Sequence, residues 1–360
     1  MNMIYKNVFR LLAGMFVACT FNACQHNVNY ENCSNFSWND FAEAKTLDSV
    51  CMNKELFLSQ PLRILCIDSI LFVQNRSGEF FLQRYTLPFL HSQGTGCIPF
   101  GHGPEEVLSI HRMQMQDSLF WLSDNMERCC IGYNRKDVLN KSEFTSVRKV
   151  CFDKPFSDIV ALPDSGFVAT VLHPEYKRLS FLNSQGLCYA TVGDYPDFGV
   201  KLSALEQIES YICEMVVDDK NGRVWLFYML TDLIEIYDLK GNLVKRMQGP
   251  DCFFPAMKEM SLEDGIQKVA SVPGETQDAY FCPLVSGDKV YVLYSGRAFS
   301  PDRSLSAYLL NHLLVFDLNG EPYKHYQLST PIYTFTIDEI HQVLYGLSFD
   351  PEYHLVKYQL

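Results

Sequence analysis

Residues 213–249 have the sequence CEMVVDDKNGRVWLFYMLTDLIEIYDLKGNLVKRMQG, in which short runs of strand-forming residues alternate with turn residues. Asp and Asn residues accompany Gly222 and Gly241, and these glycines can adopt the positive φ that tight hairpin turns need. The strands expected around the turns are Glu214–Val217, Val224–Tyr228, Leu233–Tyr237 and Leu243–Met247. This stretch therefore predicts a four-stranded antiparallel meander.

The same pattern recurs along the chain. Leu313–Phe316 is followed by the turn Asp317-Leu318-Asn319-Gly320, and Arg178–Leu182 is followed by Asn183-Ser184-Gln185-Gly186. Dividing the chain at such turns gives six units, near residues 61–105, 106–152, 153–198, 203–250, 253–328 and 330–360. Most of them have about 45–50 residues, the usual length of a propeller blade. We therefore predict an all-β, six-bladed β-propeller of four-stranded antiparallel blades, and the alternative is a β-sandwich or two small β domains.

The last unit has only three predicted strands, which would leave its outer edge unpaired. A segment from the beginning of the chain can supply the fourth strand and close the ring. Lys45–Cys51 is the candidate, so we expect residues 44–52 to pair with His354–Tyr358. Helical periodicity is confined to two short segments, Leu202–Ile212 and Phe254–Met260.

The N-terminus has the features of a secretory signal. Lys6 and Arg10 precede the apolar run Leu11–Phe21, which is too short to span a bilayer. The run ends at Phe21-Asn22-Ala23-Cys24, which resembles the lipobox of bacterial lipoproteins, in which the cysteine, here Cys24, is lipidated. An ordinary cleaved signal with an incidental cysteine is the alternative. The predicted parts of the chain are a signal peptide over residues 1–23, a polar tether over 24–43 and the propeller over 44–360.

The composition argues against several classes of function. Apolar residue types make up 48% of the chain, so a sizeable core is possible. The formal net charge is -12 and the Lys and Arg residues are scattered, which argues against a nucleic-acid partner. Apart from Cys19 in the signal and Cys24, the cysteines form no Cys-x-x-Cys and no repeated Cys/His spacing, so nothing supports a zinc site. We expect no metal and no cofactor.

A glycine-rich segment follows the first unit. Its residues Gly101-His102-Gly103-Pro104-Glu105-Glu106, together with the lipobox, are similar to the TolB-like six-bladed propeller lipoproteins of Bacteroides-type bacteria, which often carry Gly-x-Gly-Pro-x-Glu there. The C-terminal stretch Tyr333–Leu360 also looks like that group. The resemblance implies the propeller fold, export, and a lipid anchor in the bacterial outer membrane, on its periplasmic or its cell-surface face. It implies no particular reaction.

The same segment holds the first candidate ligand-binding residues. His102, Glu105 and Glu106 are expected at the mouth of the central channel, where a His beside carboxylates can bind a cation or move a proton. A rigid turn between two blades is the alternative. A phosphate cradle is not supported, because the segment lacks the Gly-Lys-Ser/Thr ending of a P-loop.

Further candidates come from the second half of the chain. Arg297 follows the strand-like run Lys289–Leu293 and can bind a carboxylate or phosphate, unless it pairs with an acid at the surface. His312 is expected near the same channel. Tyr228 and Tyr294 are expected to stack on a sugar.

The function predicted from these features is that of a binding or scaffold module on the cell envelope. Such a module would bind a glycan, a peptide or a partner protein on the funnel face of the propeller. Known catalytic motifs such as Gly-x-Ser-x-Gly and His-Glu-x-x-His do not occur. One alternative is an envelope lyase or hydrolase in which His102, Glu105, Arg297 and His312 converge in the channel. Another is a structural assembly partner without a small-molecule ligand.

Overall fold

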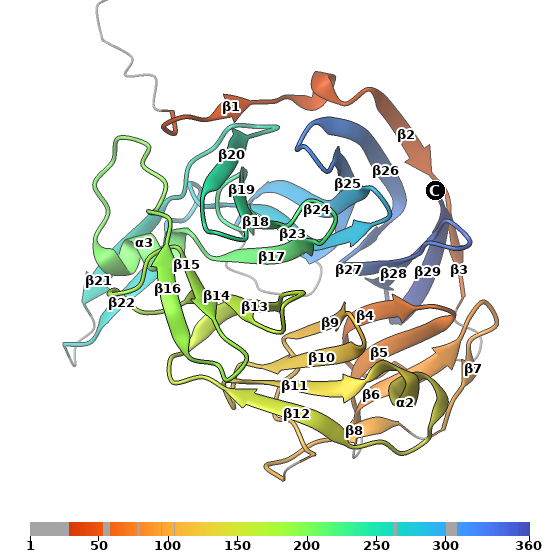
Figure 1. The fold of residues 1–360 in the computed structure, drawn as a ribbon. Coiled ribbons are helices and arrows are strands. Elements are labelled where there is room, and N and C mark those ends of the chain that lie inside the picture. Colours follow the sequence, from red (N-terminus) through yellow and green to blue (C-terminus); the bar gives the residue numbers. More distant parts are fainter. Residues whose placement is uncertain are drawn as a thin grey trace, which may run out of the picture.

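The computed structural model describes residues 29–52, 58–77, 80–94, 96–103, 105–261, 265–299 and 308–360. Six β-sheets are arranged as a ring around a central axis (Figure 1). Within each sheet, consecutive strands of the chain are antiparallel neighbours, and the first strand lies nearest the axis (Figure 1). The predicted six-bladed propeller is therefore confirmed.

Blades 1–3 follow one another along the chain, near the predicted boundaries. Their strands are β4 (Pro61–Ile67), β5 (Ile70–Ser77), β6 (Phe80–Thr86), β7 (His91–Ser92) and β8 (Cys97–Pro99) in blade 1, β9 (Arg112–Gln116), β10 (Leu119–Asp124), β11 (Cys129–Asn134) and β12 (Ser146–Cys151) in blade 2, and β13 (Phe156–Ala161), β14 (Phe167–Val171), β15 (Leu179–Leu182) and β16 (Cys188–Val192) in blade 3. The outer part of blade 1 is irregular, because β7 and β8 both pair with β6.

Blades 4–6 complete the ring. Their strands are β17 (Cys213–Asp218), β18 (Arg223–Tyr228), β19 (Leu233–Asp238) and β20 (Leu243–Gln248) in blade 4, β23 (Gln277–Ser286), β24 (Lys289–Ala298), β25 (Leu310–Asp317) and β26 (Pro322–Ile332) in blade 5, and β27 (Thr334–Asp338), β28 (Val343–Phe349) and β29 (Tyr353–Gln359) in blade 6. The turns predicted within residues 213–249 are present, with Gly222 at φ +61° and Gly241 at φ +85°.

The core lies between neighbouring blades. Successive residues of a strand point to opposite faces of its sheet, so each blade contributes to two interfaces. In β18, Trp225 and Phe227 pack against blade 5, whereas Leu226 and Tyr228 pack against blade 3. These four side chains are fully buried, and burial of such a side chain contributes about 1.5–3 kcal/mol.

The N-terminal segment forms a belt around the outer edges of three blades (Figure 1). Its strands β1 (Ser34–Asn35) and β2 (Glu43–Leu47) run parallel to β20 of blade 4 and to β26 of blade 5. Its last strand, β3 (Ser49–Cys51), pairs antiparallel with β29, which confirms the predicted closure of blade 6. The prediction of a tether over residues 24–43 is wrong for residues 29–43, because the edges of blades 4 and 5 offer free backbone groups to which this segment bonds. Residues 24–28 lie outside the described residues.

The helices among the described residues are short, and they are η1 (Trp38–Asp40), α2 (Arg135–Asn140) and α3 (Ala204–Ser210). The helix expected within 202–212 is confirmed, and Ser203 and Glu206 form a capping box at its start. The helix expected at 254–260 is wrong, because its second half is β21 (Met257–Ser261), which pairs with β22 (Gln267–Ser271) in a hairpin. Within the described ranges, no helix is both long enough and apolar enough to cross a membrane.

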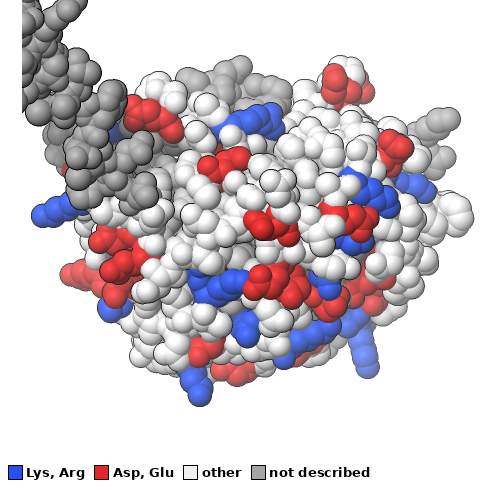
Figure 2. All heavy atoms as spheres, turned by 90° about the horizontal axis from the view of Figure 1, so that it is seen from above, with Lys and Arg blue, Asp and Glu red and all other residues white. Residues whose placement is uncertain are grey.

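The surface is mixed in charge. Figure 2 shows acidic and basic side chains interspersed on one side of the disc. All eleven cysteines in the described part of the chain have free thiols.

Candidate functional site: the central channel

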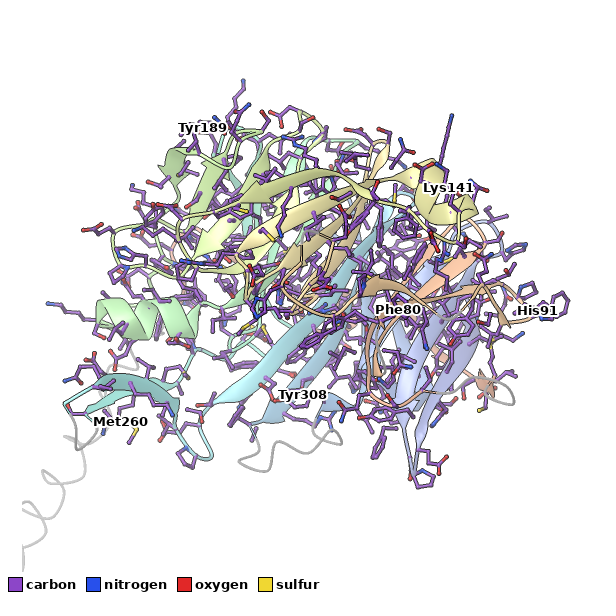
Figure 3. The ribbon with its side chains drawn as sticks, turned by 90° about the horizontal axis from the view of Figure 1, so that it is seen from below. Phe80, His91, Lys141, Tyr189, Met260 and Tyr308 are labelled. Atoms are coloured by element: carbon purple, nitrogen blue, oxygen red, sulfur yellow. The ribbon has the colours of Figure 1, made fainter. Side chains whose placement is uncertain are left out.

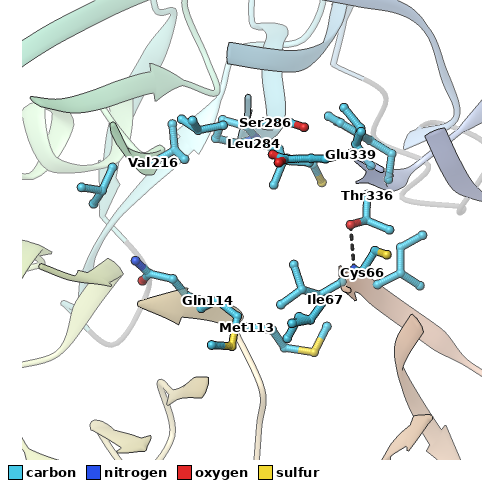
Figure 4. Close-up of a pocket in the computed structure, with 18 of the residues that line it drawn as sticks. Cys66, Ile67, Met113, Gln114, Val216, Leu284, Ser286, Thr336 and Glu339 are labelled. Carbon is cyan, nitrogen blue, oxygen red and sulfur yellow. Dashed lines mark hydrogen bonds between the residues drawn. The ribbon is translucent and has the colours of Figure 1, made fainter. Parts of the chain in front are cut away.

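The innermost strands of all six blades surround a pocket of about 570 Å³ on the axis (Figure 4). Its wall is largely apolar and includes Ile67, Met113, Val216 and Leu284 from blades 1, 2, 4 and 5. Polar groups of the wall are used to join blades. The backbone N–H of Cys66 donates to the Thr336 hydroxyl across the junction of blades 1 and 6, at 2.8 Å. The wall therefore offers an apolar surface to a ligand.

Two largely buried ion pairs lie where the innermost strands begin, one between the neighbouring blades 2 and 3 and one across the axis between blades 1 and 4. Arg112 of blade 2 donates two hydrogen bonds to Asp158 of blade 3, at 3.0 and 2.5 Å. Arg63 of blade 1 donates to Glu214 of blade 4 at 2.7 Å. Glu214 also accepts the backbone N–H of Cys282 in blade 5, at 2.6 Å. We call these groups the axial ion pairs. They connect five of the six blades and form the floor of the pocket.

The carboxylates of the axial ion pairs are held in the ionised form. Burial by itself raises the pKa of Asp158, but the Arg112 guanidinium and a contact with His111 outweigh it, so the pKa lies well below the usual range. Burial acts in the same direction on Glu214, and Arg63 and Arg112 bring its pKa below the ordinary value. Neither carboxylate is therefore poised to donate a proton near neutral pH. The arrangement suits structural closure of the channel better than acid–base chemistry.

The opposite end of the pocket is a charged mouth. The turns that follow the innermost strands supply it, together with the beginning of α2. Arg135 of α2 donates to Asp68 in the first turn of blade 1, at 2.6 Å. Asp219 accepts a hydrogen bond from the Gln116 side chain at 3.0 Å, and burial raises the pKa of its carboxyl.

On the side of blades 4–6, the mouth is tied together through one glycine. Lys220 donates to the Gly287 carbonyl, and the Gly287 N–H donates to the Glu339 carboxylate, both at 2.7 Å. Both charged side chains line the pocket. The mouth thus presents carboxylates and cations side by side, above an apolar wall.

The glycine-rich segment does not reach this channel, contrary to prediction. His102 is largely exposed and its Nδ1 lies 3.1 Å from Glu127, while Glu105 accepts from the N–H and hydroxyl of Ser146 at 2.7 and 2.8 Å. Glu106 closes its own turn by accepting the Gly103 N–H at 2.7 Å. The segment follows the outer strand of blade 1 and meets the outer strand of blade 2, so it lies toward the rim.

The two predicted sugar platforms are buried. Tyr228 is fully buried, receives a hydrogen bond from Arg178 at 2.9 Å and donates to Glu235 at 2.5 Å. Tyr294 is 1% exposed and donates to Asp251 at 2.8 Å. A ring that is covered on both faces cannot stack on a sugar, so this prediction is wrong.

Arg297 and His312 lie in blade 5, away from the pocket. Arg297 donates to the carbonyl of Leu309 nearby. His312 Nδ1 lies 2.9 Å from His325 Nε2, and the His312 ring is 5.0 Å from the Trp38 ring of the belt. Neither residue lines the channel pocket, and the convergence of His102, Glu105, Arg297 and His312 in the channel is therefore wrong.

The charged residues that do face the axis were missed by sequence reasoning. Arg63, Arg112, Asp158 and Glu214 each lie near the beginning of the innermost strand of their blade. Arg63, Arg112 and Asp158 are each the single charged residue of their strand, and Glu214 shares its strand with Asp218. A charge at the equivalent position of four consecutive repeats is a signal by which they could have been found.

Comparison with known proteins agrees with this architecture. A family model described as TolB-like 6-blade propeller-like matches residues 40–340. A member of the DUF4221 family from Bacteroides vulgatus has a similar fold, with a TM-score of 0.55 and 9% identity over 88% of this chain and 96% of that one. A Bacteroides fragilis protein named as a candidate exported protein has a TM-score of 0.49 and 11% identity over 91% and 98% of the two chains. No curated protein matches the sequence. The chain belongs to the TolB-like six-bladed propeller family.

Proposed function

We propose that this protein is an exported, lipid-anchored binding protein of the cell envelope that holds a peptide segment in its central channel. The channel pocket supports this proposal more than any other feature. Its apolar wall suits one or two side chains of a peptide, and carboxylates and cations at the mouth suit the polar groups of a peptide main chain. At about 570 Å³, it lies within the usual range for ligand pockets.

A peptide fits the wall better than a glycan does. Sugar binding relies on aromatic rings that offer a free face. Among the described residues that line the pocket, Phe335 is the sole aromatic, and it is 4% exposed because it packs between blades 5 and 6. An aliphatic side chain, in contrast, can contact Ile67, Val216 and Leu284.

The enzyme alternative has less support than binding. The four residues expected to converge in the channel do not line it, and the carboxylates of the floor are paired with arginines. Among the described carboxylates that line the pocket, Asp219 has a raised pKa, mainly because of burial, with smaller contributions from Asp117 and Asp218. The hydrogen bond that the Asp219 carboxylate accepts comes from the neutral Gln116 side chain and not from an acid or a nucleophile. A single carboxylate is not a catalytic pair.

The proposed anchor determines which way the mouth faces. In an antiparallel blade, successive turns lie at opposite ends of the strands, and therefore alternate between the two flat faces of the ring. The mouth is made by the turns after the first strands, whereas Tyr30, at the start of the belt, lies 3.0 Å from Thr231 in the turn between β18 and β19. Lipid on Cys24, five residues before the first described residue, would therefore leave the mouth facing away from the membrane surface.

Peptide binding can be tested by blocking the channel. The detergent-solubilised full chain would be screened against a peptide display library, and recovered peptides would be titrated against Val216→Trp. Val147→Trp is the matched control, because Val147 is 56% exposed on the outermost strand of blade 2. We expect Val216→Trp to weaken binding at least about tenfold and Val147→Trp to leave it unchanged. Equal binding by the two variants, or no peptide enriched by the parent protein, would contradict the proposal.

The anchor has its own test, which does not depend on the ligand. Cells would be grown with radiolabelled palmitate, and the labelling of the parent protein would be compared with that of Cys24→Ser. Label on the parent alone is the expected outcome. Equal label, or none on either protein, would overturn the lipid anchor.

A further inference from the structure

A second cavity, of about 380 Å³, lies outside the channel, between blades 1 and 2. It is built by the glycine-rich stretch that follows β7, by strand β8, and by the segment between α2 and β12. Three aromatic rings, Phe80, Tyr133 and Phe144, line it together with Ile98 and Cys97. The cavity is separate from the proposed peptide site, because the two share no lining residue.

Close backbone approach shapes this cavity. Gly96 has φ +141°, and a Cβ at this position would lie 2.7 Å from Cβ of Phe80. Only glycine allows the backbone to pass the Phe80 side chain here. On the other side, the rings of Tyr133 and Phe144 meet edge to face, with 5.5 Å between their centroids. The aromatic wall is thus defined by fixed contacts.

One polar group of the wall has no partner. Tyr133 is 1% exposed, and its buried hydroxyl forms no hydrogen bond with any residue that the structure describes. A buried hydroxyl without a partner destabilises the folded protein, and native structures seldom retain one. A ligand that bonds to this hydroxyl would remove the penalty.

The charged groups of the wall are carboxylates. Glu105 and Glu143 both line the cavity, and no Lys, Arg or His is among its described lining residues. The Glu105 carboxylate also helps to raise the pKa of Tyr133, after the larger effect of burial. Behind the wall, the Arg84 guanidinium already lies over the Phe144 ring, 5.5 Å from its centroid, so that ring face is occupied. An ammonium group is therefore attracted mainly by the Glu105 and Glu143 carboxylates, which also disfavour anions such as phosphate.

We propose that this cavity binds a small organic amine, a ligand with an aromatic or aliphatic body and an ammonium group. The body packs among Phe80, Phe144 and Ile98. The ammonium group lies near the carboxylates and donates a hydrogen bond to the Tyr133 hydroxyl oxygen. This site gives Glu105 of the glycine-rich segment a role that does not involve the channel.

The first test compares three probes that share a phenyl ring. Phenethylamine, 2-phenylethanol and phenylacetate would be titrated by calorimetry into the full chain in detergent. We expect phenethylamine to bind, 2-phenylethanol to bind at least about fivefold more weakly, and phenylacetate not to bind. Absence of phenethylamine binding at millimolar concentration would overturn the proposal, and so would equal binding of phenylacetate.

Variants then assign the binding to this cavity. Tyr133→Phe removes the unpartnered hydroxyl, so we expect an unchanged or higher Tm without ligand and an affinity for phenethylamine about tenfold lower. Glu143→Gln should lower the affinity about fivefold. Tyr189→Phe is the matched control, because Tyr189 is exposed on the outer strand of blade 3 (Figure 3). Val216→Trp in the channel should also bind the amine normally. Full affinity in Tyr133→Phe, or a loss in Val216→Trp, would refute the assignment.

Discussion

The axial ion pairs make Asp158→Asn a demanding test of how the ring is held together. In the parent protein the Asp158 carboxylate accepts two hydrogen bonds from Arg112 and one each from the backbone N–H groups of Met215 and Ile159, at 2.7 and 2.9 Å. Asparagine has nearly the same shape but no charge and only one acceptor oxygen. The substitution therefore removes the charge that Arg112 pairs with and one of its two acceptor oxygens, at a site where the Arg112 side chain is 13% exposed.

Removing one partner of a buried ion pair costs about 3–5 kcal/mol, because the other charge stays buried without compensation. The Glu214 carboxylate also attracts Arg112, so the lower end of this range applies. We expect Asp158→Asn to reduce the free energy of unfolding by about 3 kcal/mol, and Arg112→Met to have a similar effect. The double variant removes both charges and should cost about 3–4 kcal/mol rather than the sum, which is a coupling of about 2–3 kcal/mol.

Urea unfolding at pH 7, followed by fluorescence and by circular dichroism, measures these differences. Asp153→Asn, at an exposed position shortly before Asp158, is the matched control and should change stability by less than about 0.5 kcal/mol. The reasoning is refuted if Asp158→Asn also stays within that margin. An additive double variant would show instead that the two groups do not act as a pair.

Other regions of the ring give three further predictions. The His325 ring is half-buried against His312, and burial lowers the pKa of this imidazole to about 4. As the pH falls from about 6.5 to 4, His325 is therefore protonated in the unfolded chain but still neutral in the folded protein. Stability should fall across that window by about 1–2 kcal/mol after allowance for solvent screening, and His325→Phe should show a smaller fall in urea unfolding. Gly241→Ala should lower Tm, because the residue has φ +85° and its new Cβ would lie 2.4 Å from the Val192 side chain; an unchanged Tm would count against the turn. Leu47 of the belt is 3% exposed, so Leu47→Ala should reduce the free energy of unfolding by about 2–3 kcal/mol and speed proteolysis of the N-terminal segment. Cleavage at the parent rate would mean that the belt is not docked.

Local sequence determined most of the propeller. The turn Asp218-Asp219-Lys220-Asn221-Gly222 and the apolar runs around it carry their own geometry, because φ preferences and a period of two act between residues that are near in sequence. The repeat length then predicts the blade count. The closing strand could also be predicted, because the last unit contains three strands and its unpaired edge needs a fourth.

The belt could not be predicted from local sequence preferences. Residues 29–43 show no strand pattern of their own, and β1 and β2 form where the edges of blades 4 and 5 provide hydrogen-bond partners. A segment that acquires its structure from an edge assembled elsewhere gives no periodic signal.

The candidate site was likewise decided by tertiary structure. His102 and Tyr228 have chemistry suited to a binding site, but one lies toward the rim and the other is covered by Arg178 of the neighbouring blade. Arg63 and Glu214 are 151 positions apart in sequence, yet their side chains bond at 2.7 Å because the ring brings blades 1 and 4 to a common axis. Turn and strand preferences act between residues that are a few positions apart, so each repeat can be predicted from its own sequence. The distance of a side chain from the axis depends on how all six sheets pack, so it could not be predicted in this way.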